Sequence, residues 1–282
     1  MSVLTNVVVV PNRVAGVYRF LANHPDGVSL EETYQSFMPS ATTDETSGEP
    51  RNIIEKTVLE GANAGLWTTE DDLLTLSSEA EEMDDEALRT VIEESIWDEE
   101  GVNDDLGRAI AWFLAQDPLD GGWTLNRVEE TLLNTPFADE VGITKNTKYG
   151  SFRDWVCYLG FGWQVDVDGS DTRGLLPDPT AYLRRRLPDL ASAPGEEVKM
   201  AQFMQRLAAL CPVFESGRVR RSVDDTFSSR SEGHVAASTS FALERLERSG
   251  LLQIDAKADA PNPRVLQRGS KTIQASHVTW TP

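Results

Sequence analysis

The chain has 282 residues, 40% of them hydrophobic and 26% charged, and its formal net charge is −20. This length suits two domains or three small ones. Because no apolar run approaches about 18 residues, no transmembrane helix is expected. The first residues lack the basic start of a secretory leader, so we expect a cytoplasmic protein without membrane contact. Two cysteines and three histidines show no metal-ligand spacing, and neither a metal nor a cofactor is predicted.

The negative charge is concentrated in one third of the chain. Between Asp26 and Asp105 there are 24 acidic and three basic side chains, whereas the segment from Lys199 onward has 12 basic and eight acidic ones. Phosphate backbones attract local basic surface. Nucleic-acid binding is therefore directed to the C-terminal half. The acidic runs at 79–86 and 98–105 are read as a solubilising surface, and docking onto a basic partner is the alternative reading.

In chain order, a pattern of three helices and a hairpin, with a short beta-like stretch before the second helix, appears first near the N-terminus. Ser29 followed by Glu32 fits a capping box at the start of a helix, and Gly65 suits a helix C-terminus. We assign residues 1–80 to a first unit, with a polar acidic loop at 40–50. Its predicted elements are a helix at 14–22, a strand and helix start at 28–32, a third helix from residue 52, and a hairpin of 66–69 with 73–77.

The pattern returns after an acidic connecting segment at 81–105, which is read as one amphipathic helix. We assign residues 106–190 to a second unit. Its predicted elements are a helix at 109–115, a strand and helix start at 123–130, a third helix at 152–159, and a hairpin of 164–167 with 174–176 around a polar turn. Residues 188–197 are predicted to join it to the next unit, with a break at Pro194-Gly195.

A third copy is assigned to residues 197–282. Its predicted elements are a first helix at 200–208, a strand-like stretch leading into a second helix at 218–225, a third helix at 238–249, and a hairpin of 252–255 with 265–267. The fold class is therefore α+β and mostly α, with three tandem winged-helix-like units that have short β-hairpin wings. A generic helical protein with a few hairpins is the alternative.

The candidate ligand contacts are basic residues of the second and third units. In a winged helix the third helix enters the major groove, and wing residues contact phosphates. Ser238, Thr239 and Ser240 are expected to donate to phosphate at a helix N-terminus. The alternative is a solvated basic face or pairing with acidic segments. The nucleic-acid-binding candidates are Arg184, Arg185, Arg186, Arg218, Arg220, Arg221, Arg245, Arg248, Arg268 and Lys271.

No motif for catalysis is found in the sequence. Gly160-Phe161-Gly162 follows a predicted helix and is read as a helix C-cap and not as a phosphate loop. The three histidines are isolated from one another and are expected in structural or surface roles. Large aromatic residues at helical spacing usually pack in a core. We therefore expect Trp112, Trp123, Trp155 and Trp163 to form the core of the middle unit.

The layout resembles accessory proteins of bacterial phage-defence and DNA-modification clusters. The opening Met1–Pro11, which leads into a helix at Arg13–Leu21, and the overall length are similar to the G component (DpdG-like) of the Dpd system. That system inserts 7-deazaguanine derivatives into DNA and restricts DNA that lacks them. The resemblance implies protein partners in a multi-subunit complex, such as helicase-like or nuclease subunits.

Four functions follow from these observations, and the first is the leading hypothesis. It is a non-enzymatic, DNA-associated adaptor of a DNA-modification or phage-defence complex, touching DNA through units two and three. The second is a protein-interaction scaffold without nucleic-acid contact, since a fold does not determine a function. The third is a winged-helix transcriptional regulator, which usually requires a dimer. The fourth is an enzyme whose motif is not recognised.

Overall fold

The computed structural model describes most of the chain, with internal gaps. The described residues are 8–38, 49–77, 84–97, 104–132, 143, 146–166, 173–191, 193–227 and 230–281. The predicted acidic loop at 40–50 therefore lies outside them except at its end. Parts of the acidic runs at 79–86 and 98–105, and the predicted turn at 168–171, also lie outside.

The protein is α+β and predominantly helical, and its sheets are small and antiparallel, as the sequence predicts. It forms two compact units, Met1–Leu106 with Thr147–Trp155 and Gly107–Asn146 with Val156–Pro282. The finer boundaries expected at 80/81, 105/106 and 190/197 stay predictions. Among the described helices none is long and apolar enough to cross a bilayer.

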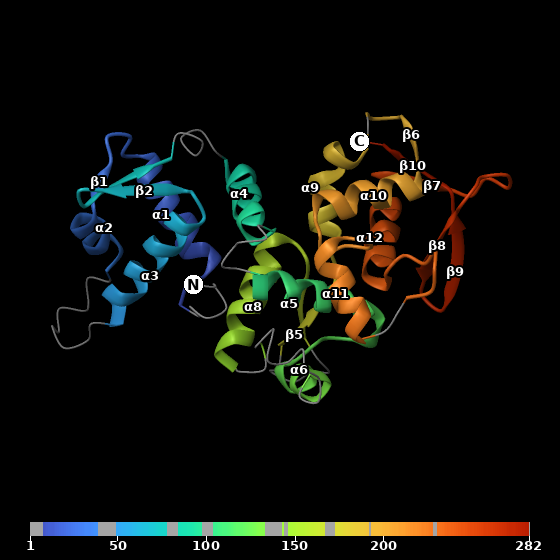
Figure 1. Ribbon diagram of the computed structural model, residues 1–282, viewed down its shortest axis with the longest axis horizontal. Helices are drawn as coiled ribbons and strands as arrows, with labels where there is room; N and C mark the ends of the chain where they lie inside the picture. The colour runs from blue at the N-terminus through green and yellow to red at the C-terminus, as the bar shows by residue number, and fades with distance from the viewer. Residues whose placement is uncertain are drawn as a thin grey trace. The chain divides into compact units, whose positions relative to one another are not determined.

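The first set of elements builds a helical layer on a three-stranded sheet (Figure 1). Ser29 caps the second helix, because its hydroxyl accepts the Glu32 backbone N–H at 3.2 Å, as the capping box predicts. Gly65, at φ +74°, ends the third helix in the left-handed region that glycine tolerates. The elements are α1 (Pro11–Ala22), β1 (Val28–Ser29), α2 (Leu30–Phe37), α3 (Glu49–Asn63), β2 (Trp67–Glu70) and β3 (Leu73–Leu76), followed by α4 (Asp85–Trp97).

Strand β3 lies in the middle of this sheet, whose order is β1-β3-β2. The β2–β3 hairpin pairs Trp67 with Leu76, which confirms the predicted hairpin. The Trp67 indole is buried and donates to the Val58 carbonyl at 2.8 Å. This bond joins the sheet to α3 and fixes the edge strand on the core.

The middle set repeats this order with a minimal first strand. Trp123 forms an antiparallel bridge with Leu175, so the order of extended segments is Trp123, β5, β4. The β4–β5 pairing confirms the predicted hairpin. The elements are α5 (Asp104–Leu114), the 3-10 turn η1 (Pro118–Asp120), α6 (Leu125–Leu132), α8 (Asn146–Leu159), β4 (Trp163–Asp166) and β5 (Arg173–Leu176).

The C-terminal set has a three-stranded sheet of order β6-β10-β7 and a separate two-stranded hairpin, β8–β9. Its elements are α9 (Thr180–Leu190), β6 (Glu197–Lys199), α10 (Met200–Leu210), α11 (Arg218–Phe227), α12 (Ala237–Arg248), β7 (Leu252–Asp255), β8 (Arg264–Arg268), β9 (Lys271–Ala275) and β10 (His277–Trp280).

In the C-terminal set, the strand that leads directly into a helix is β6, which comes before the helix that the sequence makes the first of its unit. In the first set β1 runs directly into α2, and the Leu30 N–H binds the Asp72 carbonyl. In the third, β6 runs directly into α10, and the Met200 N–H binds the Ser276 carbonyl. Helix α10 is thus the second helix of its set and α9 the first, whereas the sequence made 200–208 the first. Helix α11 lies between α10 and α12, with no strand before it, and is an addition to the order of elements seen in the first set.

The predicted hairpin of 252–255 with 265–267 is also wrong. Strand β7 pairs with β10, so that Leu252 faces Trp280, while β8 pairs with its sequence neighbour β9. The β8–β9 hairpin is therefore an insertion between the two strands that complete the sheet. Local turn signals at Pro261 and Pro263 cannot reveal such a pairing, because the partner strand lies some 20 residues further along the chain.

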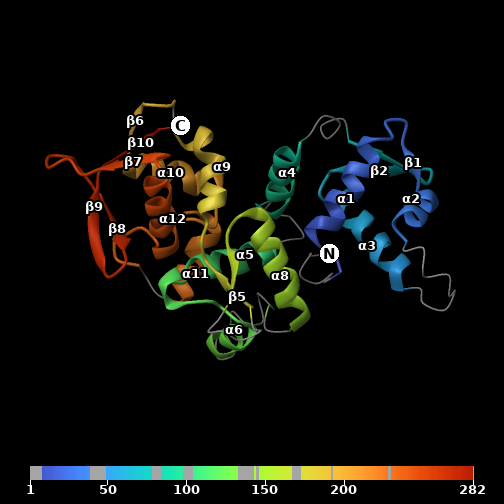
Figure 2. The same ribbon diagram turned by 180° about the vertical axis from the view of Figure 1, so that it is seen from behind.

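Helix α12 is covered by other elements on several sides. It contacts α9, β7, β8 and η1, and in Figures 1 and 2 it lies between α9 and the β8–β9 hairpin. The side chains of its first turn, Ser238, Thr239 and Ser240, are buried. The helix expected to enter a DNA groove is thus a central part of the C-terminal core.

Candidate functional site

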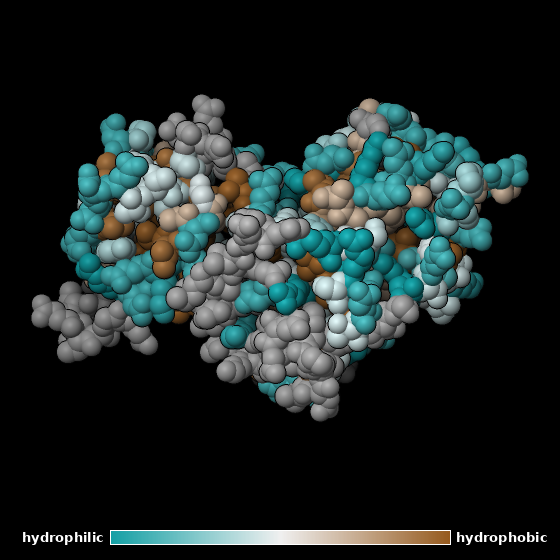
Figure 3. Space-filling view, viewed as in Figure 1, coloured by the Kyte–Doolittle hydropathy of each residue, from teal (hydrophilic) through white to brown (hydrophobic). Residues whose placement is uncertain are grey.

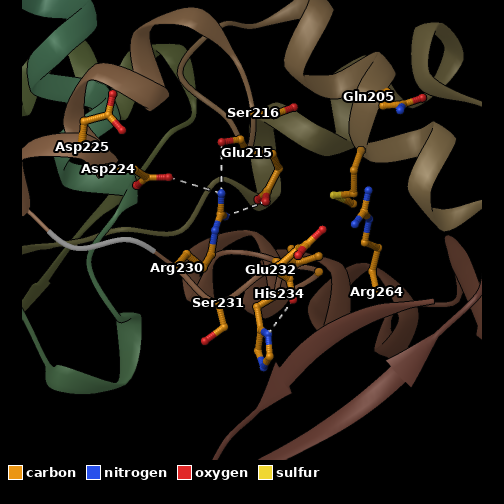
Figure 4. Close-up of a pocket in the computed structure, with 13 residues that line it drawn as sticks. Gln205, Glu215, Ser216, Asp224, Asp225, Arg230, Ser231, Glu232, His234 and Arg264 are labelled. Carbon is orange, nitrogen blue, oxygen red and sulfur yellow. Dashed lines mark hydrogen bonds and ion pairs between the residues drawn. The ribbon is translucent and has the colours of Figure 1, made fainter. Parts of the chain in front are cut away.

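A polar cleft of about 280 Å³ opens beside the N-terminus of α12. Its wall is formed by α10, the segment that follows it, α11, the loop before α12, and β8. Figure 4 shows Arg230 projecting into the middle of the cleft, where it is joined to Glu215 and Asp224. The charged and histidine residues that line it are Glu215, Asp224, Asp225, Arg230, Glu232, His234 and Arg264.

Arg230 is the centre of an ion-pair network. Its guanidinium donates to the Glu215 carboxylate at 2.6 Å and to the Asp224 carboxylate at 3.4 Å. It also donates to the Glu215 backbone carbonyl at 3.0 Å. These bonds use the fork geometry of arginine and hold the loop that precedes α12 against the segment that follows α10 and against α11.

Glu215 occupies the place where an external anion would be expected to bind. Its side chain is only 7% exposed, and its carboxylate accepts the Ala236 backbone N–H, the N-cap position of α12, at 3.3 Å. Helix N-termini favour negative charge, since their first N–H groups lack partners. The protein therefore supplies its own anion at this end of α12.

Arg220 extends the network inward. Its side chain is 3% exposed, and it donates to Asp224 at 2.7 Å and to the Leu114 carbonyl at 3.3 Å. The Ser238 hydroxyl donates to the same carbonyl at 2.5 Å. The C-terminus of α5 and the first turn of α12 thus share one acceptor, as buried polar groups generally require partners.

The cleft keeps a net negative lining after its pairs are formed. Asp225 and Glu232 are exposed, and within the described residues their carboxylates have no ion pair. Opposite them, the Arg264 guanidinium likewise has no partner among the described residues. No group of His, Cys, Asp and Glu in the described part of the chain is arranged to hold a metal ion. The arrangement is suited to anchoring α12 and to receiving a polar partner.

A serine and a histidine do meet elsewhere, at the edge of the C-terminal sheet. The Ser276 hydroxyl lies 2.9 Å from His277 Nδ1, but it also donates to the Asp255 carbonyl and accepts the Lys257 N–H. On the far side of the ring, Glu197 is 4.0 Å from His277 Nε2. Because backbone groups of β7 and the loop after it already hold the hydroxyl, it serves to link β10 to β7.

The predicted arginine triplet of α9 is divided by the structure. Arg184 is exposed and has no ion pair or hydrogen bond from its side chain within the described residues. Arg185 donates to the Leu159 carbonyl at the end of α8 and lies over the Tyr182 ring. Arg186 is mostly buried and pairs with Asp189 at 3.3 Å. Of the three arginines, Arg184 therefore faces solvent without a partner among the described residues.

The remaining candidates are also divided. Arg220 has the buried structural role described above in place of the surface contact expected. Arg268 pairs with Glu247, and Arg248 pairs with Glu244 at 2.6 Å, although its side chain is 77% exposed. Three further candidates are exposed at the surface: Arg218 and Arg221 on α11 and Lys271 on β9.

Arg245 belongs to a second cluster, which includes a tryptophan whose predicted burial is wrong. Trp112, Trp123 and Trp155 are buried, as predicted, but Trp163 is 48% exposed. The Arg245 guanidinium lies over the Trp163 ring at 4.9 Å and pairs with Asp178. Trp163 opens an edge strand immediately after the Gly160 helix end, so helical spacing no longer applies to it.

The comparisons with known proteins give one match. A family model described as DpdG-like matches residues 1–260. The chain belongs to the DpdG-like family. Neither the curated proteins nor the solved structures contain a match to this DpdG-like protein. Membership agrees with the resemblance found from the sequence, and it links the protein to a DNA-modification and defence system.

Sequence reasoning about this DpdG-like protein missed the acidic members of both clusters. Asp224 lies four residues after Arg220, a spacing that forms pairs on a helix and was an available signal. Glu215 pairs with Arg230, 15 residues along the chain, and Asp178 pairs with Arg245, 67 residues along the chain. No local pattern could have assigned their partners.

Proposed function

We propose that the protein is a non-enzymatic, DNA-associated adaptor subunit of a Dpd modification and restriction complex, built from three tandem winged-helix-like units. The observation that carries this is the repeated order of helix, strand, two helices and two strands, with the last strand in the middle of the sheet. That is the order of a winged helix. Family membership supports the link to a Dpd system.

Contact with DNA is made by scattered exposed cations and not by α12. The burial of α12 leaves its first turn without access to a groove. Arg184, Arg221 and Lys271 are exposed, and their side chains have no ion pairs within the described residues. Such groups position a protein on phosphates and carry no sequence information. We therefore propose weak binding that is independent of sequence and depends on salt.

The test is a filter or anisotropy assay with duplex DNA at increasing salt. The triple substitution Arg184→Gln, Arg221→Gln and Lys271→Gln is expected to lower the affinity. It should also reduce the slope of log K against log salt by about 0.9 for each phosphate that is no longer neutralised. The matched control is Arg19→Gln in the acidic first set. If the wild-type protein binds no duplex DNA at low salt, the proposed contact with DNA is wrong.

A protein-interaction scaffold is the second candidate function. It is favoured by the N-terminus of α12, where the Glu215 carboxylate of the protein itself accepts the N-cap N–H. Winged-helix modules also bind proteins, and a module whose recognition helix is covered suits that use. Co-expression with helicase-like or nuclease subunits of the system, followed by size-exclusion chromatography, tests it. A stoichiometric complex that survives salt strong enough to abolish DNA binding is expected. Absence of any co-eluting subunit contradicts the adaptor role.

A further inference from the structure

Trp163 differs from the other six tryptophans in its exposure. All seven lie within the described residues, and Trp163 is the one among them that belongs to the large exposed hydrophobic side chains. A single exposed apolar residue is ordinary on a protein surface. This ring, however, is held in place by a chain of contacts that reaches into the interior.

Arg245 and Asp178 provide that support. Arg245 lies over the Trp163 ring at 4.9 Å and 5.8 Å from the Phe241 ring centre. Asp178, whose side chain is 4% exposed, binds Arg245 with one oxygen and accepts the Thr180 backbone N–H at 3.0 Å with the other. A buried carboxylate thus orients the arginine, and the arginine orients the indole by a cation–π contact.

Arg248 supplies a surface charge on the helix that carries Arg245. It lies three residues after Arg245 on α12, its side chain is 77% exposed, and it pairs with Glu244. A pair that ends in so exposed a guanidinium contributes little, so Arg248 can exchange its carboxylate for a phosphate. On the face seen in Figure 3, exposed hydrophobic residues form small separate areas and no broad apolar surface.

We propose that Trp163, held by Arg245, is a stacking platform for an unpaired DNA base, with Arg248 receiving a flanking phosphate. This inference rests on the proposed association with DNA and adds a ligand class to it. Tryptophan and arginine planes stack on any base, so the platform accepts single strands without sequence preference. A duplex, whose bases are stacked on each other, does not occupy it.

The test uses the full chain and a fluorescein-labelled oligothymidylate of about 16 nucleotides, beside a duplex of equal length. Trp163→Ala is expected to weaken single-strand binding about ten-fold and to leave duplex affinity unchanged. Trp163→Phe, which keeps a stacking ring, is expected to retain most of the affinity. Leu119→Ala, another exposed apolar residue of the same compact unit, is the control and should match the wild type.

A second readout is independent of the alanine variant's stability. The unlabelled oligothymidylate is expected to quench tryptophan emission of the wild type, and the quenching is expected to vanish in Trp163→Phe, which binds without an indole at this position. Unchanged quenching in that variant overturns the proposal.

The failures of the two proposals are distinguishable. If Trp163→Ala binds the single strand as the wild type does, while the wild type binds duplex, the platform is overturned and the DNA-associated adaptor stands. If Trp163→Ala loses a co-expressed Dpd subunit with its single-strand affinity intact, the surface serves a protein partner and the platform is again overturned. If the wild type binds neither form of DNA, both proposals lose their DNA contact.

Discussion

Glu215 and Arg230 are joined by an ion pair of 2.6 Å at the N-terminus of α12, where the same carboxylate accepts a backbone N–H of the helix. Glu215 thereby serves two cationic groups, a guanidinium and a helix end. The N-cap N–H of α12 is therefore bonded to a carboxylate of the protein itself, and not to the external anion that the sequence suggested.

Replacing Glu215 is expected to destabilise the C-terminal compact unit. Glu215→Ala removes the acceptor at α12 and leaves Arg230 with Asp224 as its remaining carboxylate. We expect a loss of about 2 kcal/mol, below the cost of breaking a fully buried pair, since Arg230 is partly exposed. Glu215→Gln keeps an acceptor oxygen and should lose less. Urea unfolding measures both, with Glu232→Ala as the exposed control. Equal stability of Glu215→Ala and that control would show that the pair contributes nothing.

Arg220 and Arg221 form a matched pair of neighbours with opposite roles. Arg220→Ala removes a buried guanidinium from Asp224 and from the Leu114 carbonyl, and a loss of about 3 kcal/mol is expected. Arg221→Ala alters an exposed side chain and should change stability by less than about 0.5 kcal/mol, while weakening duplex binding. Thermal unfolding and anisotropy on the same two variants separate these effects. The reverse order of stabilities would refute the burial-based assignment.

The α9 triplet offers a second contrast between neighbours. Arg185→Ala deprives the Leu159 carbonyl at the end of α8 of its side-chain donor, and a cost of about 1 kcal/mol is expected. Arg184→Ala should leave the unfolding midpoint in place and lower the salt slope of DNA binding by about 1. If Arg184→Ala destabilises the protein as much as Arg185→Ala does, Arg184 also has a structural role and its assignment as a free surface cation is wrong.

Lowering the pH is expected to weaken the ion pair between Glu197 on β6 and Lys257 in the loop after β7. The hydrogen bond from Lys257, at 2.5 Å, lowers the pKa of the Glu197 carboxyl below its usual value, and the Lys257 and His277 charges act in the same direction. A depressed folded-state pKa means that the contribution is present above the unfolded pKa and is lost as pH falls through the folded one. An NMR titration of Glu197 should show a midpoint below that of an unperturbed glutamate, restored by Lys257→Met. A midpoint unaffected by this substitution would assign the shift to other groups.

Much of the fold could be predicted because it is encoded locally. Ser29 with Glu32, Gly65, and the alternation on either side of residues 71–72 each specify a helix start, a helix end or a turn within a few residues. The order α9, β6, α10 could not be predicted because β6 has three residues and α9 contains three consecutive arginines and Pro188. These features hide its apolar face, formed by Tyr182, Leu183 and Leu187.

The candidate sites could be predicted less well, because burial decides them. Arg220 and Arg221 are indistinguishable by residue type, yet one is inside and the other at the surface. Ser238, Thr239 and Ser240 are polar and still lie in the core. The hydrogen bonds that hold Arg220 and Ser238 to the Leu114 carbonyl join residues more than 100 positions apart. A single sequence carries no local sign of such contacts.

The burial of α12 also bears on how this family can diverge. A helix that reads DNA is free to change the side chains it presents, and new specificities arise there. In this protein half of the positions of that helix are buried, and the helix packs against α9, β7, β8 and η1. Substitutions at the buried positions therefore affect whether the chain folds. Relatives that acquire different partners should therefore differ at surface positions such as Trp163, Arg184, Arg221 and Lys271, and should keep α12 nearly unchanged.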